Sequence, residues 1–414
     1  MAEPLRMPSV LAGEREAAFG FDELFFSRTD TRGKIASGNA VFRRISRYDW
    51  DELLGSPHNI IRHPDMPRGV FWLMWDQIRQ GRPIGAYVKN RAKDGSAYWV
   101  FAIITPVEGG YLSVRLKPGS PLLAQVAAEY HALLAAERDE GLAPAASAQR
   151  LLGRLAALGF ADYRSFMAKG LMAEVLNRDR QMGARTAPTL RFFDELLTAS
   201  EGLVGSASRV AGSYQGFRFV PLNLVIQAVR LGSAGRALGT ISNNYTLLAG
   251  DIRDALDGFS AAAHAVSETI SEGAFLLATA LMQREIAGTF ASEAAEERVD
   301  HAREARLLND QRMRYTQRAL DNLMSIERNL CSFVSGTDDI RRLTSGLTAI
   351  RMMGKVEVGR LNSGVLNDLV TDLEAFQRIL TEGLGEITRM NEAMCRNACA
   401  LKAAYQTETA SVAA

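Results

Sequence analysis

Three side chains between positions 62 and 90 have the chemistry to hold a planar ligand. The guanidinium of Arg62 is a flat fork that suits a phosphate or a ring carbonyl. Trp75 could wall an apolar slot, and Asn90 could hydrogen-bond the polar edge of a ring. Plainer roles stay open: Trp75 could be ordinary core, and His63 could be a helix-cap or turn residue. Arg62 and Asp65 could form a structural ion pair.

The elements predicted around these residues form a small cup. Residues 68–80 are predicted to be a helix, because apolar side chains recur there at helical spacing and Trp75 is one of them. Asp94-Gly95 is typical of a hairpin turn. Together these segments predict an antiparallel five-stranded sheet with helices on one face, a natural site for a planar ligand. The predicted strands are 24–29, 34–37, 85–89, 97–105 and 111–117.

Composition narrows the classes of function. The 414 residues exceed one hydrophobic core, so two or three structural units are expected. Lys and Arg total 48 against 47 Asp and Glu, which leaves no basic excess to drive nucleic-acid binding. The N-terminus lacks a signal peptide and no apolar run is long enough to span a bilayer, so a cytoplasmic protein is expected. The three cysteines are predicted to be buried reduced thiols, with no metal site.

The chain changes character near Pro118. All four tryptophans lie between Trp50 and Trp99, and seven of the twelve prolines lie between Pro57 and Pro121. Long stretches rich in Ala, Leu, Arg and Glu follow. We therefore expect a compact α+β domain and then a large all-α region of helical bundle or coiled coil. The predicted divisions are an N-terminal segment 1–20, a sensor domain 21–117, a helical linker 118–189, and two helical hairpins, 190–300 and 301–414.

The first domain resembles the PAS domains of bacterial aerotaxis receptors. The resemblance runs in order through 39–42, 55–67, 74–75, 88–91, 94–95 and 98–100, and its most specific block is Pro57-His58-Asn59-Ile60-Ile61-Arg62-His63-Pro64-Asp65-Met66-Pro67. It implies a PAS sensor of redox state or oxygen that binds FAD non-covalently. The flavin-pocket residues that it implies are Asn39, Arg62, His63, Asp65, Trp75 and Asn90.

A shorter segment, 221–236, resembles the kinase-control tip of bacterial chemoreceptors. It departs from that family where Gln227 and Ser233 replace two glutamates. The resemblance implies a chemotaxis-type histidine kinase or coupling protein as partner, and the departures leave a divergent signalling partner open. The residues expected to bind that partner are Asn223, Arg230, Arg236, Glu357 and Arg360.

A second copy of the tip segment supports an internal repeat. Residues 350–363 align without gaps against 220–233, so that Arg360 matches Arg230 and Val356 matches Ile226. Repetition usually means one supersecondary unit used twice. We therefore predict two hairpins packed as an antiparallel four-helix bundle within one chain. Arg230 and Arg360 should be exposed near the bundle tips, and Ile226 and Val356 should face a common core.

These observations favour a cytoplasmic signal transducer in which a flavin-binding PAS domain drives a helical output. A haem-binding PAS sensor, with His58 or His63 as axial ligand, is one alternative. A cofactor-free adaptor or scaffold is another, and a homodimer through the PAS domain is possible. We expect no enzyme activity, because the sequence has no nucleophile motif, no Gly-rich dinucleotide loop and no paired carboxylates in a cleft pattern.

Overall fold

A computed structural model describes residues 15–217, 219–295, 298–361 and 364–413. The chain forms two compact units. The first comprises Met1–Asp194 with Ser271–Asn322, and the second comprises Glu195–Ile270 with Leu323–Ala414. Two helices, α9 (Arg236–Ser292) and α10 (His301–Leu361), contribute residues to both units.

The first unit contains a five-stranded antiparallel sheet, which confirms the predicted fold class. The strand order is β2-β1-β5-β4-β3, and we call residues 25–116 the sheet domain. The helices α1, α2 and α3 and the short 3₁₀ helix η1 are inserted between β2 and β3 in the chain. The elements are β1 (Phe25–Asp30), β2 (Ile35–Gly38), α1 (Ala40–Ser46), α2 (Trp50–Leu53), η1 (His58–Ile61), α3 (Arg68–Arg79), β3 (Ile84–Arg91), β4 (Ala97–Val107) and β5 (Gly110–Leu116).

Side-chain alternation gives the sheet two distinct faces. On β5, Ser113 and Arg115 point toward α3, and Val114 between them points the other way. On β1, Ser27 shares the inner face, while Phe26 and Arg28 lie on the outer face. Both faces are therefore covered, which explains why nearly all residues of β1, β3 and β5 are buried.

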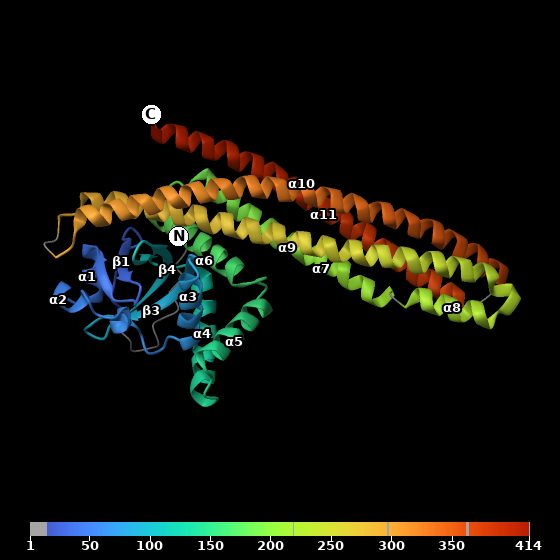
Figure 1. Ribbon diagram of the computed structural model, residues 1–414, viewed down its shortest axis with the longest axis horizontal. Coiled ribbons are helices and arrows are strands. Elements are labelled where there is room, and N and C mark those ends of the chain that lie inside the picture. Colours follow the sequence, from blue (N-terminus) through green and yellow to red (C-terminus); the bar gives the residue numbers. More distant parts are fainter. Residues whose placement is uncertain (1–14, 218, 296–297, 362–363, 414) are drawn as a thin grey trace, which may run out of the picture. The chain divides into compact units, whose positions relative to one another are not determined.

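The outer face of the sheet packs against the end of α9 and the start of α10 (Figure 1). Phe26 meets the ring of Phe290 edge to face, with centroids 5.0 Å apart. The guanidinium of Arg28 forks onto the Glu304 carboxylate, with Nε 2.9 Å from both carboxylate oxygens. Both side chains of this ion pair are almost fully buried, at 9% and 2% exposure. A helical hairpin is thus an integral layer of the first unit.

Three further helices of the first unit are held by buried carboxylates. They are α4 (Pro121–Asp139), α5 (Pro144–Ala157) and α6 (Tyr163–Met182). Glu174 on α6 accepts hydrogen bonds from the backbone N–H of Ser120, at 2.9 Å, and from the hydroxyl of Tyr87, at 2.8 Å. Glu137 on α4 accepts from the backbone N–H of Gly69, at 3.0 Å, at the start of α3. Both carboxylates satisfy unpaired N–H groups at helix N-termini.

The second unit is an antiparallel four-helix bundle. Its helices are α7 (Pro188–Phe217) with α8 (Val220–Arg230), α9, α10, and α11 (Gly364–Ala413). In the first hairpin, Ser242 of α9 donates to the carbonyl of Pro221, and Tyr214 of α7 donates to the carbonyl of Ala249. The residue numbers rise in one helix as they fall in the other, so the two run in opposite directions.

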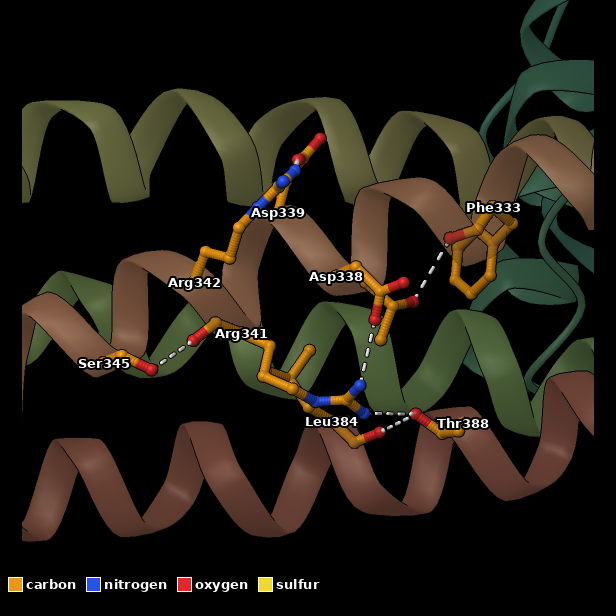
Figure 2. A network of polar contacts seen from close by, with 9 residues as sticks. Phe333, Asp338, Asp339, Arg341, Arg342, Ser345, Leu384 and Thr388 are labelled. Carbon is orange, nitrogen blue, oxygen red and sulfur yellow. Dashed lines mark hydrogen bonds and ion pairs between the residues drawn. The ribbon is translucent and has the colours of Figure 1, made fainter.

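In the second hairpin, polar side chains of α10 contact α11. Figure 2 shows Arg341 bridging Asp338, 2.9 Å away on its own helix, and the Thr388 hydroxyl, 3.3 Å away on α11. Thr388 in turn donates to the Leu384 carbonyl at 2.8 Å. These groups are largely exposed, so they add little stability.

The two tip segments that align in sequence also share an environment. Val220 and Ile350 are both 5% exposed, whereas Leu222 and Met352 are 56% and 57% exposed. Each segment is helical and comes near the end of the first arm of a hairpin. One solvent-facing stripe and one core-facing stripe therefore occur at equivalent positions, as an internal repeat requires.

One detail of the repeat prediction was wrong. Ile226 and Val356 were expected to face the core, but they are 41% and 70% exposed. The core-facing stripe passes instead through Val220 and Leu224, which are one helical turn apart. A residue two positions beyond Leu224 lies on nearly the opposite side of the helix, so Ile226 points to solvent.

One helix in the described residues, α9, is long and apolar enough to cross a membrane by length and composition alone. In its most apolar window 72% of the residues are buried inside the protein. That degree of burial is also typical of the core helix of a bundle.

Candidate cofactor site

A cavity of about 290 Å³ lies between the inner face of the sheet and α3. This volume is near the lower end of the range of ligand pockets, about 300–1,000 Å³. Exposed residues at its edge, Arg32, Pro57 and Asn59, mark its mouth. The cavity is therefore the cup that the sequence predicts between sheet and helices.

Two opposed apolar walls make the cavity a slot. One wall comes from successive turns of α3 and the other from β3 and β4. The wall residues are Phe71, Met74, Trp75 and Ile78 from α3, and Val88, Ala102 and Ile104 from the strands. The Trp75 ring stands edge-on to Tyr111 of β5, with centroids 5.6 Å apart. A flat, largely apolar group would be shielded from water on both faces in such a slot.

Gly33 lets the β1–β2 turn approach Trp75. Its φ is +81°, a region that side-chain-bearing residues rarely adopt. A Cβ at this position would lie 3.0 Å from the indole of Trp75. Both the positive φ and the short distance to the Trp75 indole therefore favour glycine at this position.

Three of the six predicted pocket residues line the cavity: Arg62, Trp75 and Asn90. The guanidinium of Arg62 stacks 4.0 Å from the Phe71 ring centroid and donates to the Met66 carbonyl at 3.1 Å. Burial lowers the pKa of Arg62, mainly because desolvation disfavours its charge. It is thus a partly desolvated cation at the cavity wall.

Asn90 carries an unpaired polar atom into the site. The residue is 3% exposed, and its side-chain nitrogen has no hydrogen-bond partner within the described chain. The hydroxyl of Ser113, another lining residue, is also buried without a partner in the described residues. Buried polar atoms are nearly always paired in native proteins, so these two atoms point to a ligand that pairs with them.

The other three predicted pocket residues lie outside the cavity lining. Asn39 caps α1 by accepting from the Phe42 N–H at 3.3 Å, and it donates to Glu293 at 3.2 Å. His63 is buried, and its Nδ1 accepts from the backbone N–H of Asp65 at 3.1 Å. The structure thus gives these residues scaffolding contacts around the cavity.

Asp65 forms an ion pair with a buried lysine. Its carboxylate lies 3.0 Å from the Nζ of Lys89. Burial alone would raise the pKa of Asp65, but the hydrogen bond and the charge of Lys89 outweigh it and hold that pKa below its usual value. The ion-pair alternative for Asp65 therefore has a partner, although the partner is Lys89 and not Arg62.

The cavity is also lined by a polar cluster of Ser27, His58 and Arg115. The Arg115 Nη2 donates to the Ser27 hydroxyl at 2.9 Å and lies 2.8 Å from the His58 Nε2. Desolvation, together with the nearby guanidinium, lowers the pKa of His58 to about 3, so the imidazole is neutral and accepts from Arg115 at Nε2. Burial lowers the pKa of Arg115 to about 10, which leaves the guanidinium charged at neutral pH.

Sequence reasoning missed Ser27 and Arg115 and considered His58 only as a haem ligand. A signal for Arg115 does exist. In β5 the polar Ser113 and Arg115 alternate with Leu112, Val114 and Leu116, which predicts that both polar residues share one face of a buried strand. A charged residue at such a position is rarely buried without a reason.

The residues expected to bind a partner all lie in the second unit. Asn223 and Arg230 are exposed on α8, and Arg236 is exposed at the start of α9. Arg360 is exposed near the end of α10 and pairs with Glu357, 2.7 Å away. Arg230 and Arg236 flank the short 3₁₀ helix η2 (Gly232–Gly235), and Arg360 is the next-to-last residue of α10.

The described residues contain no cluster of His, Cys, Asp and Glu suited to a metal ion. The cysteines are all free, but they are less buried than the sequence suggested. Cys331 and Cys399 are exposed and Cys395 is half-buried. The prediction of buried thiols was wrong, because these positions lie on the outward sides of α10 and α11.

Comparison with known proteins places the sheet domain in a family. Residues 35–113 match the family model of the PAS fold, which confirms the predicted PAS domain. The aerotaxis receptor of Escherichia coli (strain K12) is 41% identical over 117 residues, which are 27% of this chain and 23% of that protein, in the PAS region only. The nitrogen fixation regulatory protein of Klebsiella pneumoniae is 33% identical over 81 residues, which are 20% of this chain and 16% of the relative.

The chain therefore spans less than a quarter of the length of these curated relatives. Among solved structures, the light state of the blue-light photoreceptor Aureochrome1 LOV covers 25% of this chain and 88% of its own, at 22% identity and a TM-score of 0.22. The LOV domain of the Erythrobacter litoralis EL346 blue-light activated histidine kinase covers 22% and 90%, at 14% identity and a TM-score of 0.20.

Proposed function

We propose that this chain is a signal transducer whose PAS cavity binds FAD and reports redox state or oxygen to a protein partner through its helices. The observation that carries the proposal is the convergence of Arg62, Trp75 and Asn90 on one slot. Arg62 follows η1, Trp75 lies on α3 and Asn90 lies on β3, and all three were expected from the resemblance to aerotaxis-receptor PAS domains.

The residues present fit a flavin ring. The apolar slot between α3 and the sheet suits a flat tricycle. The unpaired nitrogen of Asn90 and the unpaired hydroxyl of Ser113 supply hydrogen bonds for its polar edge. The exposed Arg32 at the mouth offers a cation to the phosphates that would extend outward. When bound, FAD would supply the change of redox state, and the protein would supply orientation and electrostatics.

Strand β1 provides a route from the cavity to the helices of the same unit. Ser27 lines the cavity, and the next residue, Arg28, forks onto Glu304 of α10 on the other face. A change of hydrogen bonding at Ser27 would therefore bias the backbone that positions this ion pair. Signalling by such a device needs two arrangements of the hairpin that the ligand stabilises unequally.

The output proposed for the second unit is contact with a chemotaxis-type histidine kinase or coupling protein, or with a divergent signalling partner. Its support is the position of Arg230 and Arg360, exposed at equivalent places in the repeat. The proposal assigns the chain no catalytic step, no nucleic-acid partner and no membrane span. It places the protein in the cytoplasm and leaves room for a homodimer through the PAS domain.

Absorbance of the purified chain tests the cofactor. We expect the blue absorbance of a flavin, and release by heat followed by chromatography should identify FAD. Trp75→Ala and Asn90→Ala should each lower flavin occupancy after dialysis, because they remove a slot wall and a hydrogen-bond donor. The matched control is Trp72→Ala on the same helix, because Trp72 is 39% exposed and lies outside the cavity lining.

Other outcomes decide between the alternatives. A Soret band would replace flavin with haem, for which His58 is the candidate ligand that lines the cavity. To bind haem iron through Nε2, His58 would first have to break its hydrogen bond with Arg115. A colourless protein would favour the cofactor-free adaptor. Full retention of flavin by both Trp75→Ala and Asn90→Ala would show that the ring binds elsewhere.

A further inference from the structure

The protein has four buried cationic side chains among its described residues, and three of them face a carboxylate. Arg28 pairs with Glu304, Lys89 with Asp65 and Arg178 with Glu285. The fourth, Arg115, is 3% exposed and pairs with no carboxylate in the described part of the chain. Burying a charge without an opposite charge is costly, so this exception calls for a partner.

The groups around Arg115 are all neutral. Its nitrogens lie 2.9 Å from the Ser27 hydroxyl, 3.4 Å from the Ser113 carbonyl and 2.8 Å from the His58 Nε2. The ring centroids of Phe25 and Phe42 each lie 5.6 Å from the guanidinium carbon, and these rings stabilise the cation but carry no net charge. None of these contacts supplies a negative charge. Arg115 lines the cavity, so a ligand in the cavity can supply one.

We infer that Arg115 is a binding site for negative charge on the ligand, and that it holds the reduced, anionic flavin ring more tightly than the oxidised, neutral ring. The inference rests on the proposed function. The oxidised ring takes up two electrons and one proton to reach the anionic reduced form. The electrons come from an external donor, such as a quinol or a reduced nicotinamide. The negative charge that remains on the ring then faces the guanidinium.

Preferential binding of the reduced form raises the reduction potential of the flavin. The site is buried, so the attraction is weakly screened by water. Ser27 and His58 orient the guanidinium without neutralising it, because both are uncharged hydrogen-bond partners. Arg115 therefore acts as a binding residue that tunes the potential at which the sensor changes state.

The test is the midpoint potential of the full-length flavin-loaded protein, titrated with dithionite against a reference dye. Arg115→Gln should reduce the preference for the reduced ring at least tenfold, which is about 30 mV for a two-electron couple. Arg115→Lys keeps the charge and should restore most of the potential. The control Arg91→Gln removes a positive charge from an exposed position on β3 and should leave the potential unchanged.

A second variant guards against loss of folding in Arg115→Gln. Ser27→Asp keeps the guanidinium and places a carboxylate beside it, so it should also lower the potential. If Arg115→Gln or Ser27→Asp keeps its flavin at the wild-type potential, the inference is wrong and the proposed function stands. If the wild-type chain binds no flavin, both fail together. A fall in potential for both variants, with Arg91→Gln unchanged, supports the inference.

Discussion

The buried ion pair between Arg28 and Glu304 should hold the helical hairpin onto the sheet domain. Glu304→Gln removes the negative charge and leaves the Arg28 guanidinium almost fully buried without a counter-charge. Breaking a buried pair from one side typically costs about 3–5 kcal/mol. With a urea slope of about 2 kcal/mol per M, the unfolding midpoint of the first unit should fall by roughly 1.5–2.5 M.

Tryptophan fluorescence is the suitable assay, because all four tryptophans lie between Trp50 and Trp99 in the sheet domain. The double variant Arg28→Met with Glu304→Leu should recover most of the loss, since a packed apolar pair often replaces a buried ion pair at little cost. The matched control is Asp51→Asn. It breaks an exposed pair with Arg298, 2.9 Å long, in the same unit, and should cost less than about 1 kcal/mol.

The reasoning would be refuted by additive effects in this cycle. If the double variant loses as much stability as Arg28→Met alone and Glu304→Leu alone lose together, the two side chains do not interact in the folded protein. A Glu304→Gln midpoint equal to that of Asp51→Asn would show that the pair is exposed to water. Flavin content has to be matched among the samples, because bound ligand adds to stability.

Three further predictions follow from the cavity and the tips. Gly33→Ala should lower the free energy of unfolding by about 1–2 kcal/mol, because the φ of +81° is unfavourable for alanine. It should also lower flavin occupancy, because the added methyl group would lie 3.0 Å from the Trp75 indole. Fluorescence-detected unfolding measures the first effect and absorbance measures the second. The pKa of His58 is lowered to about 3, so the unfolded chain binds the extra proton between pH 6.5 and 3, and stability is lost as pH falls through this range. The loss should be roughly 1–2 kcal/mol from pH 6.5 to 5, and a flat response would contradict the desolvation of this imidazole. Arg230→Ala and Arg360→Ala should change the free energy of helical unfolding, followed by circular dichroism, by less than about 0.5 kcal/mol. Both variants should capture less of a coupling protein than the wild type does. Equal capture by the wild type and both variants would show that these arginines do not bind that partner.

The sequence predicted the sheet domain well, because turn residues and alternation are local signals. Asp94-Gly95 was expected to close a hairpin, and it joins β3 to β4. Trp75 and Asn90 were expected near the ligand because the motif of the resemblance carries them, and both line the cavity. Arg115 was missed because its role depends on the absence of a carboxylate beside its guanidinium. A missing carboxylate partner is a property of the folded neighbourhood, which brings Ser27, His58 and β5 together from distant parts of the chain.

Longer-range packing was harder to predict than local structure. The helices of 301–361 and 364–413 were expected, but nothing in their pattern predicted that 271–322 would belong to the compact unit of the sheet. Asn39 shows the same limit. Its motif suggested a flavin contact, whereas the structure shows its amide joining α1 to Glu293. That contact pairs residues 254 positions apart, beyond the reach of any local pattern.

The internal repeat predicted in the second unit would free the two sides of its tip to evolve separately. In a symmetric dimer every substitution occurs twice, so both sides of the assembly present the same surface. Here one chain encodes both sides, and equivalent positions have already diverged. Val229, which is 75% exposed, corresponds to Gly359, and Asn223 corresponds to Met353. A partner that distinguishes these sides could dock in a single orientation, with one copy per chain.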